Sequence, residues 1–261
     1  MRFDIALCQM MVEASKEKNV EKAVEYIKES SRRGALMCIL PEMFNCPYDI
    51  SLFNNYAEDD SGDTIAAIRA AAKEHGLIVV AGSIPEIDGD KIYNTSYVIS
   101  ERGEILGKHR KVHLFDIHIP GEVIFKESAV LSSGDDITVI DTSYCKIAIA
   151  ICYDLRFPEM FQKGREEGAY LTVLPGAFHN FTGPKHWELL LRARAVDSQM
   201  YIAGVSSAMN NNSEYKSYGH SMMISPDGDI VTKTDFDEDL IIGEINLDTV
   251  DYVRRNIPLT R

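Results

Sequence analysis

The sequence predicts an α/β fold, and two observations carry this prediction. Short apolar runs of strand length alternate with longer segments whose apolar residues recur at helical spacing. Both halves of the chain also follow a similar order of strand, helix, strand and helix, followed by a pair of strands, which is typical of α/β proteins. Because no linker or low-complexity stretch divides the sequence, we expect residues 1–261 to form a single domain.

The first half of the chain is expected to contain two helices, each ended by a glycine. In the first helix, Val20, Ala23 and Ile27 share one face, and Gly34 follows the last turn. The second helix ends in the same way at Gly76. The expected helices cover residues 17–33 and 60–76. The expected strands cover residues 3–10, 35–40, 77–83 and 95–100, the last two on either side of a turn at residues 88–90.

The second half is expected to contain two further helices and a larger set of strands. Pro158 stands at a first helical position, where the missing N–H would have no partner in any case. The expected helices cover residues 158–168 and 184–199. The expected strands cover residues 147–151, 170–174, 201–207, 221–225, 230–232 and 240–247.

Composition argues against several kinds of partner. The chain has 27 basic and 40 acidic residues, a net charge of −13, and no basic stripe that would bind a nucleic-acid backbone. No apolar run approaches the roughly 20 residues needed to cross a membrane, and the N-terminal residues lack the apolar core of a signal peptide. The five cysteines are odd in number and have no paired short spacing, which favours free thiols in a cytoplasmic protein.

The segment AIAICYDLRFPE, residues 148–159, places a thiol where a buried strand meets a helix. Residues 147–151 form an apolar run, and Cys152 ends it shortly before Pro158 begins the next helix. Such a junction leaves backbone N–H groups that can stabilise a thiolate or an oxyanion. Cys152 is therefore a candidate nucleophile, although a cysteine ending an apolar strand is also a common core residue.

Two acids and a lysine are further candidates. Glu42 follows the strand expected at residues 35–40, at the sheet edge where α/β proteins usually build their sites. Lys111 ends a densely basic loop expected at residues 108–111, and the apolar residues after it indicate that part of this loop points inward. Glu127 follows a Pro–Gly turn. Taken alone, either carboxylate is equally an ordinary loop residue.

Three neighbouring histidines, His109, His113 and His118, raise the question of a metal site. Basic residues lie between them, and no acidic ligand stands in helical register with them. We therefore expect hydrogen-bonded scaffold residues and no metal. No Gly-rich turn follows the first strand, so a dinucleotide cofactor is not expected either.

Three separated stretches carry a family resemblance: LPEMF at residues 40–44, HRKVHLFD at 109–116 and AICYDLRFPE at 150–159. A glutamate behind one strand, a lysine in a loop and a cysteine at an elbow, in that order, resemble the nitrilase superfamily of carbon–nitrogen hydrolases. PGAF at 175–178 and HWELLLRARAVDSQ at 186–199 extend the likeness over nearly the whole chain. Within the superfamily, the chain is most similar to the omega-amidases, through FDIHIPG, FKES, TGPKHWELL and YGHSM.

The resemblance implies a four-layer α-β-β-α sandwich, commonly paired into a homodimer. It gives Glu42, Lys111 and Cys152 the roles of general base, electrostatic stabiliser and nucleophile. Glu127 becomes an additional acid near the lysine, and the backbone N–H of Tyr153 would hold the oxyanion. The implied reaction releases ammonia from the ω-amide of a small dicarboxylic acid, such as succinamate, 2-oxoglutaramate or 2-oxosuccinamate, through a cysteine thioester.

The sequence identifies the substrate-binding residues less clearly than the catalytic ones. Phe44, Tyr48 and Phe178 follow expected strand ends, where an aromatic ring either lines a pocket or packs in the core. Arg156 is the cation nearest to the thiol in sequence. It either binds the far carboxylate of the substrate or braces the elbow by pairing with an acid such as Glu159, and we expect bracing.

Two other functions stay open from the sequence. An amidase for deaminated glutathione, from the same superfamily, shares RFPE and YGHSM with this chain. The second is a binding protein that keeps the fold and has lost catalysis. The intact Glu42, Lys111 and Cys152 argue against this function. The shape of the pocket is also open, because His179 stands where relatives often have Asn or Gly and because Cys46 lies close in sequence to Glu42.

Overall fold

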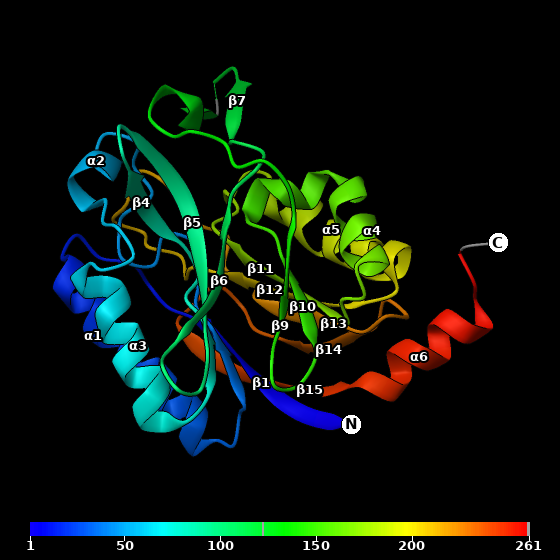
Figure 1. The fold of residues 1–261 in the computed structure, drawn as a ribbon. Coiled ribbons are helices and arrows are strands. Elements are labelled where there is room, and N and C mark those ends of the chain that lie inside the picture. Colours follow the sequence, from blue (N-terminus) through cyan, green and yellow to red (C-terminus); the bar gives the residue numbers. More distant parts are fainter. Residues whose placement is uncertain (122, 260–261) are drawn as a thin grey trace.

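Two β-sheets packed face to face form the centre of the molecule, whose computed structural model describes residues 1–121 and 123–259 (Figure 1). The first sheet has the order β15 (Asp239–Asn246), β1 (Arg2–Gln9), β2 (Met37–Ile39), β3 (Ile78–Val80), β5 (Lys91–Ile99) and β4 (Ile84–Asp88), and β6 (Ile105–Arg110) pairs with β5. The second has the order β14 (Ile230–Lys233), β13 (Met222–Ile224), β12 (Tyr201–Ser206), β11 (Leu171–Gly176), β10 (Lys146–Ile149) and β9 (Thr138–Asp141).

Helices cover the outer faces of both sheets (Figure 1). The first sheet is covered by α1 (Lys16–Arg32) and α3 (Asp63–His75), and the second by α4 (Pro158–Glu166) and α5 (Gly183–Ser198). Two further helices are α2 (Phe53–Tyr56) and α6 (Leu247–Asn256). The expected four-layer α-β-β-α sandwich is confirmed. No helix of the described residues is long and apolar enough to traverse a lipid bilayer.

The alternation of side chains along the strands produces these layers. In β1, Phe3, Ile5 and Leu7 point between the sheets, where they meet residues of β10, β11 and β12. Ala6 and Cys8 point the other way, toward α1 and α3. Because side chains alternate in a strand, one strand can contribute to two separate cores.

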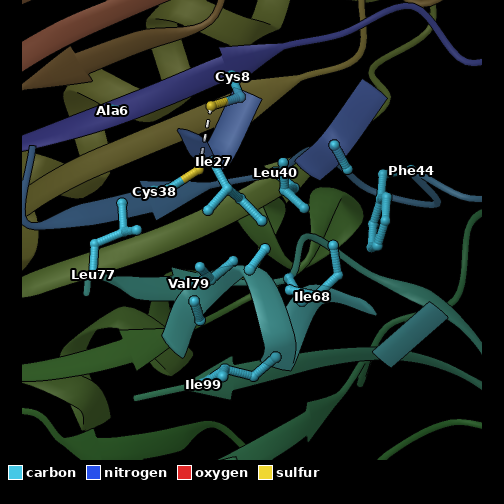
Figure 2. Packing of buried hydrophobic residues seen from close by; sticks show 14 of the residues in the cluster. Ala6, Cys8, Ile27, Cys38, Leu40, Phe44, Ile68, Leu77, Val79 and Ile99 are labelled. Carbon is cyan, nitrogen blue, oxygen red and sulfur yellow. Dashed lines mark hydrogen bonds between the residues drawn. The ribbon is translucent and has the colours of Figure 1, made fainter. Parts of the chain in front are cut away.

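The core beneath α1 and α3 contains a close pair of thiols (Figure 2). The sulfur atoms of Cys8 on β1 and Cys38 on β2 lie 3.4 Å apart, and Ser30 of α1 also contacts Cys8. Phe44, which could have lined the pocket, packs in this core and is fully buried (Figure 2). Phe44 is therefore a core residue on the outer face of the first sheet.

The loops that follow parallel strands gather at one edge of the sandwich. β2 runs parallel to β1 and β3, and β10 runs parallel to β11. Glu42 lies just beyond β2, and Cys152 lies just beyond β10. The first of these loops needs a glycine beside it: Gly82 has φ 39°, and a Cβ there would lie 1.9 Å from the carbonyl oxygen of Pro41.

The structure corrects two predictions in the first half of the chain. The basic stretch at 108–111 is not a loop, because β6 continues through Arg110. Lys108 and Arg110 are accepted there because both pair with Glu86 of β4. The predicted strand at 77–83 is also wrong in extent, since β3 ends at Val80 and the residues flanking the turn at 88–90 belong to β4 and β5.

Other elements were not predicted. β7 (Asp116–Ile119) and β8 (Val123–Lys126) form a small antiparallel hairpin above the sheet edge (Figure 1). The helix α6 follows directly from β15 and buries Val250 and Val253. The sequence signal for α6 is short, because only these two apolar residues at helical spacing become buried.

Candidate active site

Three of the predicted residues meet in a fully buried ion cluster. The Nζ atom of Lys111 lies 2.9 Å from Oε1 of Glu42 and 3.0 Å from each carboxylate oxygen of Glu127. All three side chains have 0% exposure. Glu42 comes from the loop after β2, Lys111 follows β6, and Glu127 begins a 3-10 turn after β8. The fold thus gathers one cation and two acids from distant parts of the chain.

Neighbouring groups donate further hydrogen bonds to the two acids. Asn94 donates to Oε1 of Glu42 over 2.8 Å. The hydroxyl of Tyr48 donates to Glu127 over 2.6 Å and accepts from Lys111 over 3.3 Å. The backbone N–H of Phe115 donates to the other oxygen of Glu127 over 2.6 Å. Within the described residues, Oε2 of Glu42 is buried and accepts no hydrogen bond.

Glu42 shares the positive charge of Lys111 with Glu127, so this charge offsets only part of the cost of burying the Glu42 carboxylate. Burial raises the pKa of Glu42, the charge of Lys111 opposes this, and the charge of Glu127 adds to the increase, so the pKa ends above its ordinary value. Burial alone would lower the pKa of Lys111, but the charges of Glu127 and Glu42 raise it. Lys111 therefore remains an ammonium, whereas Glu42 is held closer to the range in which it can exchange a proton.

Cys152 lies beside this cluster at a strained turn. Its φ of 45° is rare for a residue with a side chain, and it connects β10 to a 3-10 turn over Cys152–Arg156. Burial raises the pKa of the thiol well above its ordinary value, and the charge of Glu42 raises it further. A backbone hydrogen bond from Ala177 acts in the opposite direction. The thiol is therefore protonated at rest and adjacent to a carboxylate that can accept its proton.

The backbone around the thiol supplies a donor for a developing negative charge. Among the hydrogen bonds of the described residues, none uses the N–H of Tyr153. This N–H follows the sulfur-bearing residue directly at the start of the 3-10 turn. This N–H, predicted as the oxyanion donor, is thus free to donate a hydrogen bond to an oxygen bound next to the thiol.

A buried carboxylate that the sequence analysis did not single out holds this turn in place. Asp154 accepts the N–H of Ile151 over 3.0 Å, and both the N–H and Nδ1 of His113 over 2.9 and 2.8 Å. Burial alone would raise the pKa of Asp154, but hydrogen bonds from His109 and His113 lower it well below its ordinary value. Asp154 therefore ties the cysteine turn to the segment that follows Lys111.

Two of the three histidines are scaffold residues, as expected. His113 stacks on Phe157 with ring centroids 3.4 Å apart, in addition to its bonds with Asp154. His109 is buried and hydrogen-bonds Thr138 over 3.1 Å. His118 lies apart from them on the exposed side of β7. Asp154 was not predicted, because its histidine partners lie more than 40 positions earlier in the chain.

Known proteins are similar in sequence to this chain over nearly its whole length. A family model described as carbon–nitrogen hydrolase matches residues 4–255. The chain belongs to the carbon–nitrogen hydrolase family. An omega-amidase from Xenopus laevis is 45% identical over 260 residues, which cover 100% of this chain and 94% of the relative. An omega-amidase from Homo sapiens is 42% identical over 99% of this chain and 94% of its own length.

Solved structures agree with this assignment. A Saccharomyces cerevisiae member of branch 10 of the nitrilase superfamily superposes with a TM-score of 0.92 at 37% identity, covering 100% of this chain and 96% of that one. The C. elegans NitFhit protein gives a TM-score of 0.90 at 32% identity, covering 99% of this chain and 64% of that one. The expected nitrilase-superfamily membership and hydrolase class are confirmed.

The space in front of the thiol of this hydrolase is small. Cys152, Tyr153, Arg156 and Phe178 line a cavity of about 10 Å³, enough for roughly one water molecule. Tyr215, from the segment between β12 and β13, lines the same cavity and was not predicted. That segment has no apolar periodicity, so no local pattern predicted Tyr215.

Arg156 lies at this cavity, and among the described residues it forms no ion pair with an acid, so the predicted pairing with Glu159 or a loop acid is wrong. One of its terminal nitrogens lies 3.3 Å from Nδ1 of His186. Its guanidinium lies over the ring of Phe178 at 5.4 Å and that of Tyr153 at 5.5 Å. A cation held by rings beside the thiol is well placed to meet an anionic group.

Proposed function

We propose that this protein is a thiol-dependent omega-amidase that hydrolyses the ω-amide of small dicarboxylic acid monoamides to the dicarboxylate and ammonia. One observation carries the proposal: a single buried ammonium, Lys111, is shared by two carboxylates directly beside a buried thiol at a strained turn. The omega-amidase relatives support the substrate class.

In the first half of the proposed reaction, Glu42 takes the proton of the Cys152 thiol as the sulfur attacks the amide carbon. The N–H of Tyr153 and the ammonium of Lys111 stabilise the negative charge that forms on the carbonyl oxygen. Glu42 then returns the proton to the amide nitrogen, the C–N bond breaks, and ammonia leaves. The acyl group remains on the sulfur as a thioester.

In the second half, a water molecule replaces ammonia. Glu42 removes a proton from this water as its oxygen attacks the thioester carbon, and the same donors stabilise the second oxyanion. The C–S bond breaks, the sulfur recovers a proton from Glu42, and the dicarboxylate is released. Oε2 of Glu42, which accepts no hydrogen bond within the described part of the chain, is the oxygen that exchanges these protons.

Glu127 has a positioning role in this scheme. Both of its oxygens are occupied by Lys111, Tyr48 and the N–H of Phe115. A carboxylate engaged in this way orients the ammonium toward the reacting carbon and keeps it charged. Tyr48 assists by linking Glu127 to Lys111.

Arg156 is proposed to bind the far carboxylate of the substrate. It lines the cavity at Cys152 and has no carboxylate partner in the described structure. We expect Arg156→Met to raise KM for succinamate by about 10- to 100-fold, the effect of losing a charged hydrogen bond. Butanamide, which has the same chain length and no carboxylate, is the matched control and should be hydrolysed equally by both proteins. An equal loss on both amides would mean that Arg156 does not bind the carboxylate.

Ammonia release tests the proposal directly. Purified protein is mixed with succinamate or 2-oxoglutaramate, and Cys152→Ala is compared with Cys145→Ala, whose thiol lies away from the cluster and is half-buried. We expect release by the wild type and by Cys145→Ala, and none above background by Cys152→Ala. No release by the wild type, or undiminished release by Cys152→Ala, would refute the proposal.

A further inference from the structure

The side chain of Tyr215 separates the thiol from two much larger cavities. One cavity of about 300 Å³ is lined by Glu42 and Tyr48, and another of about 320 Å³ by Phe125 and His179. The cavity of about 10 Å³ contains Cys152. Tyr215 lines all three, so its ring is a wall common to them.

Several contacts fix this wall. The hydroxyl of Tyr215 donates to the carbonyl oxygen of Ala177 over 2.6 Å. Its ring centroid lies 4.5 Å from that of Tyr48, 5.4 Å from that of Phe125 and 5.1 Å from that of His179. Burial raises the pKa of the phenol, and the nearby charges of the catalytic groups raise it further, so the side chain stays neutral. A neutral ring held on several sides makes a firm boundary.

The size of the space at the thiol limits what can bind there. A volume for about one water is far below the roughly 300 Å³ or more of ordinary small-molecule sites. The space at the thiol is therefore tight, and a longer acyl chain needs the room on the far side of Tyr215. Beyond it lies a cavity of mixed lining, in which Val123, Ile124 and Phe125 form one apolar side that a methylene chain can contact. Polar residues, among them Asp49 and Glu214, form the rest of its lining.

We propose that Tyr215 is a specificity-determining residue that limits the length of the acyl chain the enzyme accepts. The inference rests on the proposed amidase function. With Tyr215 in place, a short monoamide puts its far carboxylate at Arg156. Without the ring, the space at Cys152 joins the cavity of about 320 Å³, whose side formed by Val123, Ile124 and Phe125 then receives the chain of longer primary amides of the same chemical class.

The experiment measures chain-length selectivity as the ratio of kcat/KM for adipamate, the six-carbon monoamide, to kcat/KM for succinamate. We expect Tyr215→Ala to raise this ratio by about tenfold or more, since a methylene that packs against apolar side chains such as Val123 and Phe125 is worth about that much. Tyr215→Phe keeps the ring and should leave the ratio within about twofold. Tyr252→Ala, at a tyrosine that is 63% exposed, is the matched control and should behave as the wild type.

A second readout is independent of turnover. Alkylation of Cys152 is followed by mass spectrometry with iodoacetamide, which is small, and N-phenylmaleimide, which is bulky. The wild type should favour the small reagent, and Tyr215→Ala should lose most of that preference. Tyr215→Leu, which keeps more apolar volume, provides a second variant if the alanine variant does not fold.

The outcomes separate this inference from the proposed function. If Tyr215→Ala, or Tyr215→Leu in its place, changes neither the substrate ratio nor the reagent preference, Tyr215 is not the wall and the inference is overturned. If no protein releases ammonia but the reagent preference still falls, the wall is supported and the omega-amidase proposal fails.

Discussion

Two buried glutamates of the same sheet have opposite electrostatic environments. Glu86 of β4 is 2% exposed and Glu42, after β2, is 1% exposed. Both pair with cations from the end of β6: Lys108 and Arg110 bind Glu86, whereas Lys111 binds Glu42. Both carboxylates are shielded from solvent, but Lys108 and Arg110 are 38% and 23% exposed whereas Lys111 is fully buried. The two sites therefore differ in the solvent access of the cations and in how many charges compensate each carboxylate.

The numbers of partners explain the difference. Burial alone would raise the pKa of Glu86, but hydrogen bonds from two cations and from Thr95 lower it to about 2. Glu42 shares one cation with Glu127, and its pKa is raised. A fully compensated carboxylate stabilises the fold, whereas an undercompensated one retains the capacity to accept a proton. The number of cations that compensate each carboxylate thus distinguishes the structural ion cluster of Glu86 from the reactive cluster of Glu42.

The largest expected effect follows from removing the shared cation. Lys111→Met leaves Glu42 and Glu127 buried without their counter-ion, and we expect a loss of about 3–5 kcal/mol in the free energy of unfolding. Urea denaturation measures it. Lys108→Met is the control, because Glu86 keeps Arg110, and should lose about 1 kcal/mol. Equal losses for the two variants would break the comparison.

Neutralising Glu42 should separate activity from stability. Glu42→Gln removes the proposed general base, so ammonia release should fall by about 10²- to 10⁴-fold. The variant still pairs Lys111 with Glu127, and its free energy of unfolding near neutral pH should equal or exceed that of the wild type. Thermal unfolding and an ammonia assay on one preparation check both. A variant that keeps its activity, or loses stability, would show that Glu42 is a structural residue.

The same change at Glu86 should give the reverse result. Glu86→Gln should lower the free energy of unfolding by about 2–3 kcal/mol at neutral pH. This is less than the roughly 3.4 kcal/mol that its lowered pKa corresponds to, because Lys108 and Arg110 are partly exposed and solvent screens their charges. Because Glu86 lies outside the catalytic cluster, ammonia release should be nearly unchanged. The measurement is a pair of urea curves at the same pH. Loss of activity with unaltered stability would contradict this assignment.

The smallest expected effect is the pH dependence of these differences. The pKa of Glu86 is lowered in the fold, so its stabilisation is present above the ordinary carboxyl pKa and is lost as pH falls toward about 2. The pKa of Glu42 is raised, so its burial destabilises the fold as pH rises through that pKa. Wild type should therefore exceed Glu86→Gln in stability at neutral pH and converge with it in acid, and any advantage of Glu42→Gln should also vanish in acid.

How much the sequence predicted depends on where each residue lies. Glu42 and Cys152 were predictable because each directly follows a recognisable apolar strand within a family motif. The extent of β6 was not, because the basic residues in it are balanced by Glu86, more than twenty positions earlier. The position of Tyr215 depends on its packing against Tyr48 and other distant rings, a relation that no local pattern encodes.

An acyl group on the thiol of Cys152 would be direct evidence for the proposed thioester. Wild-type protein is mixed with succinamate, quenched in acid during turnover and digested, and the peptides are examined by mass spectrometry. We expect a succinyl group on the peptide that contains Cys152 in the wild type and in Cys145→Ala, and none on the corresponding peptide of Cys152→Ala. Turnover with no acyl group on Cys152, or with the acyl group on another residue, would contradict the proposed thioester.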